Sequence, residues 1–299
     1  MVHALCVGNC IAQYLVGDQN LKLIGQTSRG CFLQTSFPSV WTVFLTEETP
    51  RGPLTINLPT GVINPIKHAA EKTIILRHGI LHFSDTLKLS LQNTPLWQAT
   101  APLSPIQPLA TRQTTIAEAI RIIKQRKPEN QLTGILPDLL PILAIPSHPS
   151  STGGGFTDKL HELITGLHAS DTNSLASLLA AFLGQGSGLT PSGDDFLLGF
   201  FLTLHRWGAH LSFSDSVRPL GRSIAESAKH QTTYLSSNLI ECAIHGEADQ
   251  RLINALDGLM TAEKCDPAWV NGLLTWGSCS GLDAFAGMIL ASDCRIARV

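Results

Sequence analysis

Residues 188–204 read GLTPSGDDFLLGFFLTL, and this stretch decides the helical half of the fold. Its first eight residues are mostly small or acidic, and the nine that follow are almost all apolar. A helix without a polar face is buried on all sides, so we expect a central helix from residue 196 onward. A shorter version, CSGLDAFAG, stands at residues 279–287. The two segments share the pattern Ser-Gly-x-Asp-x-x-x-Gly, and most of the functional interpretation depends on this repeat.

The repeat has a purely structural interpretation. Ser followed three residues later by Asp is typical of a helix start, because the hydroxyl accepts an early backbone N–H and the carboxylate reaches back to the capping residue. Ser192 with Asp195, and Ser280 with Asp283, fit this capping box. The glycine that ends each copy would let a neighbouring helix approach closely. This interpretation needs no ligand.

Capping does not account for the alternating Gly184, Gly186 and Gly188, for Thr190 or for a second acid at Asp194. A glycine-rich turn that opens a helix exposes backbone N–H groups at the positive end of the helix dipole, which favours an anion. Two such turns at one cleft would hold a carboxylate and a phosphate, or a developing oxyanion. The residues expected to bind are Gly186, Gly188, Thr190, Ser192, Gly193, Ser280 and Gly281, with Asp194, Asp195 and Asp283 in catalytic or orienting roles.

A third polar cluster lies in HQTTYLSSNLIECAIHG, residues 230–246. Several of its hydroxyl and amide groups share one helix face, because they are spaced three or four residues apart. They either form a solvent-facing first turn or line the same cleft, and the members predicted to bind are Thr233, Ser236, Ser237 and Asn238. No cofactor is evident, although Asp194 would either orient a substrate amide or hold Mg²⁺.

The organisation of the chain predicts an α+β fold. The first hundred residues contain short segments rich in β-branched and aromatic residues, such as VWTVFLT, TIILRHG and LKLSL, separated by turns. Without helices for crossovers between them, an antiparallel β-rich domain, a sheet or small barrel, is expected over 1–104. A helix and a Pro/Gly-rich connection follow over 105–155, and an all-helical domain over 156–299. The glycines at 153–155 lack a following Gly-Lys-Ser/Thr, which excludes a Walker P-loop.

Composition narrows the possible partners. A formal net charge of -2 argues against nucleic acid or an anionic membrane as the partner. The seven cysteines show no CxxC spacing, which argues against zinc and a disulfide framework and favours reduced thiols in the cytoplasm. Neither a signal peptide nor an apolar run of about 20 residues is present. Charged residues make up only 15% of the chain, which suggests a surface partly hidden in an oligomer or complex.

Three segments together resemble the family of the small subunit of oxamate carbamoyltransferase, the AllH-type family, many of whose members are labelled as a domain of unknown function. They are GQGSGLTPSGDDFLLGF at 184–200, TTYLSSNLIECAIHG at 232–246 and GSCSGLDAFAG at 277–287. The resemblance spans Leu175 to Leu290, with a looser similarity in RGPLTINLP near the N-terminus. The chain departs from the family pattern at Ser187, where the family usually has Pro, and we expect this change to alter loop stiffness more than chemistry.

The resemblance implies a part in anaerobic purine (allantoin) breakdown. There, the carbamoyl group of N-carbamoyl-oxamate passes to phosphate, and other, larger subunits take part. No Ser–His–Asp or Cys–His nucleophile set is evident, so direct attack by phosphate is favoured over a covalent intermediate. Two alternatives stay open at this point. One is a non-catalytic interaction subunit, and the other is a small anion- or metabolite-binding module.

Overall fold

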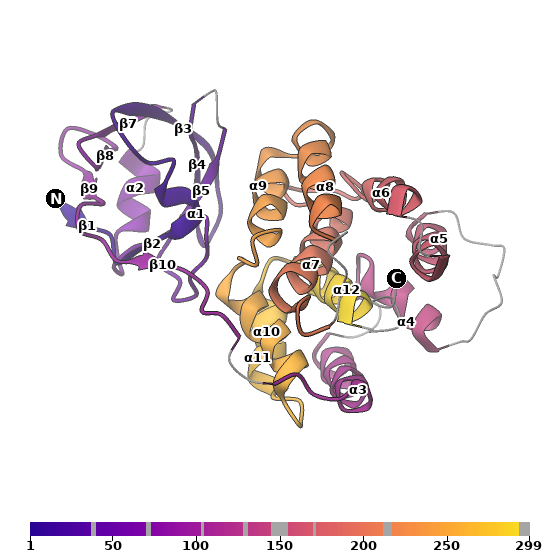
Figure 1. The fold of residues 1–299 in the computed structure, drawn as a ribbon. Coiled ribbons are helices and arrows are strands. Elements are labelled where there is room, and N and C mark those ends of the chain that lie inside the picture. Colours follow the sequence, from indigo (N-terminus) through magenta and orange to yellow (C-terminus); the bar gives the residue numbers. More distant parts are fainter. Residues whose placement is uncertain are drawn as a thin grey trace. The chain divides into compact units, whose positions relative to one another are not determined.

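The computed structural model describes residues 1–36, 40–69, 73–102, 105–127, 131–144, 155–169, 172–211 and 217–292. The chain divides into two compact units (Figure 1). The first comprises Met1–Thr100 and Glu247–Gln250, and the second comprises Ala101–Gly246 and Arg251–Val299. Strands occupy the first unit and long helices the second. The predicted α+β class, an antiparallel β-rich part followed by a helical part, is therefore confirmed.

The first unit is built on a curled sheet of ten strands (Figure 1). The strands are β1 (Val2–His3), β2 (Cys6–Gly8), β3 (Gln19–Gln26), β4 (Gly30–Gln34), β5 (Thr42–Thr46), β6 (Thr55–Asn57), β7 (Thr73–Arg77), β8 (Ile80–His82), β9 (Lys88–Ser90) and β10 (Leu96–Trp97). Their order is β1-β9-β8-β7-β3-β4-β5-β6-β2-β10. Most neighbours are antiparallel, and the pairs β1–β9, β5–β6 and β2–β10 are parallel. Two short helices, α1 (Asn9–Ala12) and α2 (Ile63–Ala69), complete the unit.

Alternating side chains form the core of the sheet. In β7 the burial alternates along the strand, with Ile74 and Leu76 fully buried between exposed neighbours. Adjacent side chains in a strand point to opposite faces, so this pattern places one face of the sheet on a core. Gly30 in β4 is required by packing, because a Cβ atom there would lie 2.1 Å from the Leu45 carbonyl oxygen on β5.

The regular secondary structure in the described residues of the second unit is helical. Its helices are α3 (Leu109–Arg126), α4 (Leu136–Ala144), α5 (Phe156–Ala169), α6 (Thr172–Ala180), α7 (Ser192–Trp207), α8 (Val217–Gln231), α9 (Tyr234–Ala243), α10 (Gln250–Thr261), α11 (Pro267–Thr275) and α12 (Ser280–Ser292). The segment containing α4 was expected to be part of a connection. Pro137 nevertheless fits a helix, because a proline in the first turn needs no hydrogen-bonded N–H. Gly153 and Gly154 lie outside the described residues.

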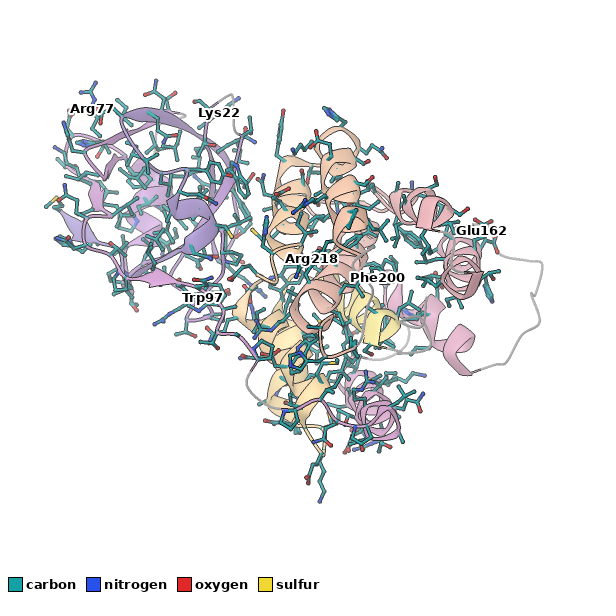
Figure 2. The ribbon with its side chains drawn as sticks, viewed as in Figure 1. Lys22, Arg77, Trp97, Glu162, Phe200 and Arg218 are labelled. Atoms are coloured by element: carbon teal, nitrogen blue, oxygen red, sulfur yellow. The ribbon has the colours of Figure 1, made fainter. Side chains whose placement is uncertain are left out.

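Helices α7 and α12 form the centre of this unit. Every residue of α7 from Ser192 to Leu204 is buried, and so is every residue of α12. Figure 2 shows the Phe200 side chain on α7 among the side chains of the helical unit, consistent with an exposed fraction of 1%. The central buried helix predicted from the sequence is therefore present. None of the helices in the described ranges is long and apolar enough to cross a membrane.

The two central helices cross at their glycines. A Cβ atom on Gly199 would lie 1.8 Å from the Ala284 carbonyl oxygen, and one on Gly287 would lie 2.0 Å from the Phe196 carbonyl oxygen. Neither position has room for a methyl group between the backbones. The close approach expected from these two glycines is confirmed, and it brings the N-terminal ends of α7 and α12 into the same region.

Candidate functional site

The glycine-rich turn before α7 has a conformation that only glycine adopts readily. Gly184, Gly186 and Gly188 have φ angles of 69°, 115° and 96°. Residues other than glycine rarely adopt φ angles in this left-handed region. Gly186 and Gly188 are exposed, and a Cβ atom on Gly186 would lie 2.7 Å from the backbone nitrogen of Ser192. The alternation of glycines is therefore explained by the backbone path of this turn.

The predicted capping box at α7 is wrong. The N-cap residue is Pro191, it makes no side-chain capping bond, and Ser192 is already the first helical residue. The backbone N–H groups of Asp194 and Asp195 donate to the Pro191 carbonyl, at 3.0 and 3.1 Å. In α12 the N–H of Asp283 likewise donates to a main-chain carbonyl, that of Cys279. The carboxylates of both copies are thus free to point away from their own helix ends.

The serine of each motif hydrogen bonds to the aspartate of the other motif, on the other helix. We call this arrangement the exchange of side chains, or the exchanged motif. The Ser280 hydroxyl of α12 hydrogen bonds to the carboxyl group of Asp195 on α7. The Ser192 hydroxyl of α7 hydrogen bonds to the carboxyl group of Asp283 on α12. Thr190 Oγ1 lies 3.2 Å from Ser280 Oγ and also contacts Asp195. The structure therefore brings the two motifs together at one place, and each serine serves the aspartate of the other copy.

Asp194 occupies a neighbouring position with partners of its own. Its Oδ1 atom accepts the Gly184 N–H at 2.8 Å, and its Oδ2 atom accepts the Thr232 hydroxyl. The Ser236 hydroxyl also lowers the pKa of this carboxyl, although Ser236 Oγ has no partner at ordinary hydrogen-bond geometry. Asp194 therefore connects the glycine-rich turn to the junction of α8 and α9, which the sequence did not predict.

The third polar cluster is only partly at the site. Thr233 is the N-cap of α9, where its Oγ1 atom accepts the Ser236 N–H at 3.1 Å and donates to the Leu189 carbonyl at 2.7 Å. Ser236, Ser237 and Asn238 are buried in the first turns of α9. The alternative of a solvent-facing turn is therefore wrong for these three residues. Their predicted role in binding a ligand stays a prediction.

Burial shifts the acids of the site toward their protonated forms. The pKa of Asp195 is raised well above its ordinary value by burial, against a lowering by the Ser280 hydrogen bond, and the nearby Asp283 raises it further. Burial also raises the pKa of Asp283, to about 6, against hydrogen bonds from Ile135 and Ser192. The pKa of Asp194 is raised by burial as well. Carboxyl groups that hold a proton near neutral pH are typical of acid–base sites, and buried structural acids show the same shift.

Three further residues belong to the cluster and were not predicted from the sequence. The Ile135 N–H donates to Asp283 Oδ1 at 2.6 Å, just before α4 begins. Gly134 has a φ of 89°, and a Cβ atom there would lie 2.1 Å from the same oxygen. The Cys279 thiol also hydrogen bonds to Asp283, and Cys279 is half-buried. A glycine followed closely by a proline in LTGILPD was a local signal of a helix start, but not of its distant partner.

Two of the predicted anion donors are engaged within the chain. The Gly193 N–H donates to the Gln185 carbonyl at 2.8 Å, and the Gly281 N–H donates to the Trp276 carbonyl at 3.0 Å. A Cβ atom on either glycine would lie 2.0 Å from a carbonyl oxygen of a preceding segment, which explains the choice of glycine by packing. Their role toward an anion stays a prediction. In the described part of the chain, no group of three or more His, Cys, Asp or Glu residues could hold a metal ion.

Part of the chain matches a model of a known protein family. Residues 182–292 match the family model described as oxamate carbamoyltransferase subunit AllH. No curated protein and no solved structure matches the chain. The matched segment contains the glycine-rich turn, α7 to α12 and both copies of the motif. The resemblance indicated by the three sequence segments is therefore confirmed: over residues 182–292 the chain matches the family of the oxamate carbamoyltransferase subunit AllH.

Proposed function

We propose that the chain is a subunit of a carbamoyltransferase that moves the carbamoyl group of an N-carbamoyl-oxamate-like substrate to phosphate. The products are oxamate and carbamoyl phosphate. The observation that carries this proposal is the exchange of serine and aspartate between the two motifs, because it gathers hydroxyl donors and protonatable acids at one point. The family match over the same segment supports the choice of reaction.

The chemistry of the transfer fits these groups. A phosphate oxygen attacks the carbamoyl carbon, the C–N bond to the oxamate nitrogen breaks, and that nitrogen takes up a proton. Hydrogen-bond donors aimed at the developing oxyanion lower the barrier. In our proposal the hydroxyl groups of Thr190 and Ser280 supply such donors, and Asp194, whose pKa is raised by burial, supplies the proton to the leaving nitrogen.

Phosphate itself requires positive charge that these residues do not provide. The side chains that the two motifs bring together are hydroxyl and carboxyl groups, and neither kind of group carries a positive charge. We therefore propose that a partner subunit supplies the phosphate-binding groups, together with Mg²⁺ bound to the phosphate. A cytoplasmic role in purine (allantoin) breakdown belongs to the same proposal.

A double substitution tests the site. Ser192→Ala with Ser280→Ala removes both exchanged hydroxyls, and we expect carbamoyl phosphate formation by the complete complex to fall by about 10²-fold or more. Ser223→Ala on the exposed surface of α8 is the matched control and should leave the rate unchanged. Full activity of the double variant would refute the assignment of the site.

A second candidate function is a non-catalytic subunit in which the motif only joins helices. It is favoured by the complete burial of Asp195 and Asp283, which are 1% and 0% exposed. Thermal-shift measurements with phosphate, carbamoyl phosphate, oxamate and nucleotides separate the two functions. Stabilisation by carbamoyl phosphate or oxamate supports the enzyme. No shift with any ligand, together with activity in the partner subunits alone, supports the structural role.

A further inference from the structure

Two carboxylate oxygens of the exchanged motif have no hydrogen-bond partner. Asp195 Oδ2 and Asp283 Oδ2 are both buried, and neither atom has a hydrogen-bond partner of ordinary geometry in the described part of the chain. An unsatisfied buried polar atom is costly, so proteins rarely keep one without a reason. The other oxygen of Asp283, Oδ1, accepts the Ile135 N–H. The unpaired atoms therefore point to a ligand.

The charge of the surroundings restricts what that ligand can be. Three acids interact electrostatically at this place. The charges of Asp194 and Asp283 both raise the pKa of Asp195. A phosphate or carboxylate placed among them would be repelled. No described group of side chains suits a metal ion. A neutral group that carries N–H donors is the chemistry that remains.

We propose that Asp283 Oδ2 and Asp195 Oδ2 bind the amide end of a carbamoyl-bearing ligand, with Asp283 accepting an N–H of its NH₂ group and Asp195 donating to its carbonyl oxygen. This proposal rests on the proposed function and adds which end of the substrate these acids recognise. The anionic end of the ligand then lies away from the two acids, toward the exposed turn at residues 185–189.

The protonation of the two acids is consistent with this arrangement. Burial and the neighbouring charge of Asp283 raise the pKa of Asp195 well above its ordinary value, which favours the carboxylic acid form that can donate. Asp283 has a pKa of about 6 and is ionised at pH 7.5, so it accepts. One donor and one acceptor match the carbonyl and NH₂ of a carbamoyl group, whereas an acetyl group offers a methyl in place of the NH₂.

A matched pair of ligands tests the inference by binding alone. Carbamoyl phosphate and acetyl phosphate have the same phosphate and carbonyl and differ only in NH₂ against CH₃. Isothermal titration of the full chain at pH 7.5 should show carbamoyl phosphate binding at least about tenfold more tightly, because a site built for an N–H leaves its acceptor unpaired with the analogue. Equal affinity for the two ligands in the wild-type protein overturns the inference.

Asp283→Asn tests the named acceptor. The Asn side chain keeps an oxygen for the Ile135 N–H but presents NH₂ where Oδ2 stood. We expect the ratio of the two affinities to fall to about one, with thermal unfolding confirming that the variant is folded. Asp158→Asn, on the exposed first turn of α5, removes the same charge and should keep the tenfold ratio. A retained ratio in Asp283→Asn overturns the assignment.

A thiol at the site gives an independent readout. Carbamoyl phosphate should slow the reaction of Cys279 with iodoacetamide, measured by peptide mass spectrometry, more than acetyl phosphate does. Equal binding of the two ligands would contradict recognition of the amide end by these acids, but it would not contradict the proposed function. If neither ligand binds or protects Cys279, both this inference and the ligand site of the proposed function fail in the isolated chain.

Discussion

Replacing Gly199 by Ala tests the crossing of α7 and α12 on which the site depends. A Cβ atom there would lie 1.8 Å from the Ala284 carbonyl oxygen, and that oxygen belongs to the backbone of a fully buried helix. The helices would have to separate by about 1.6 Å to reach an ordinary contact. Overpacking of this kind costs about 3 kcal/mol. Ala is a better helix former than Gly by about 1 kcal/mol, so we expect a net loss of about 2 kcal/mol in the free energy of unfolding.

Gly272→Ala is the matched control for this experiment. Gly272 also lies inside a helix, α11, but the nearest atom to its Cβ would be the Arg251 Cβ at 3.4 Å, an ordinary contact. At this position Ala is still the better helix former but causes no clash. The free energy of unfolding should therefore rise by about 0.5–1 kcal/mol. The two variants should therefore differ by about 3 kcal/mol in opposite directions from the wild type.

Urea unfolding followed by far-UV circular dichroism measures both variants, and hydrogen exchange of the α7 amides shows where the loss occurs. The reciprocal variant Gly287→Ala should behave like Gly199→Ala. The double variant should cost less than the sum, because one separation of the helices relieves both clashes. A Gly199→Ala protein as stable as the wild type would refute the close crossing and with it the exchange of side chains at the helix ends.

Two further predictions concern stability. Asp283 has a pKa of about 6 in the folded chain against an ordinary value of 3.8, so the folded state binds more protons than the unfolded state between about pH 4 and 6. The free energy of unfolding should therefore fall by up to about 3 kcal/mol as the pH rises through that window and level off above it. Urea unfolding of Asp283→Asn across the same pH range should show a clearly smaller fall. An identical pH profile in the variant would contradict the raised pKa of Asp283. Thr233→Ala removes the N-cap of α9 and its bond to Leu189, and should lower the unfolding free energy by about 1 kcal/mol. Ser223→Ala is its control on exposed α8, and equal stability of the two variants would argue against the cap.

Local sequence patterns predicted the elements that depend on local physics. Richness in β-branched and aromatic residues indicated strands such as β7, and the absence of a polar face on residues 196–204 indicated the buried α7. The glycines of the two motifs predicted a close helix approach, since close backbone packing leaves few other choices. Segment α4 was read as part of a connection because of its prolines, although Pro137 lies in a position that a helix tolerates.

Contacts between residues far apart in the chain could not be predicted from the sequence alone. The capping box fits Ser192 and Asp195 by spacing, yet the structure places Ser192 one residue too far into the helix and gives its hydroxyl to Asp283. Spacing cannot tell these two arrangements apart, because both need a hydroxyl and an acid at the same positions. The bond from Ile135 to Asp283 joins residues 148 positions apart, and no local pattern predicts it. The inclusion of Glu247–Gln250 in the first unit is of the same kind.

The exchange of side chains makes the two motifs a single unit. Asp195 is served by the Ser280 hydroxyl and Asp283 by the Ser192 hydroxyl, so neither copy satisfies its own acid. Apolar residues at the two helix starts would pack the helices equally well. They would also avoid the free-energy cost of burying acids. Two acids kept at this cost, each with one oxygen still unpaired, are explained when a ligand completes them. Under the proposal made above, the repeat is one binding site divided between two helices.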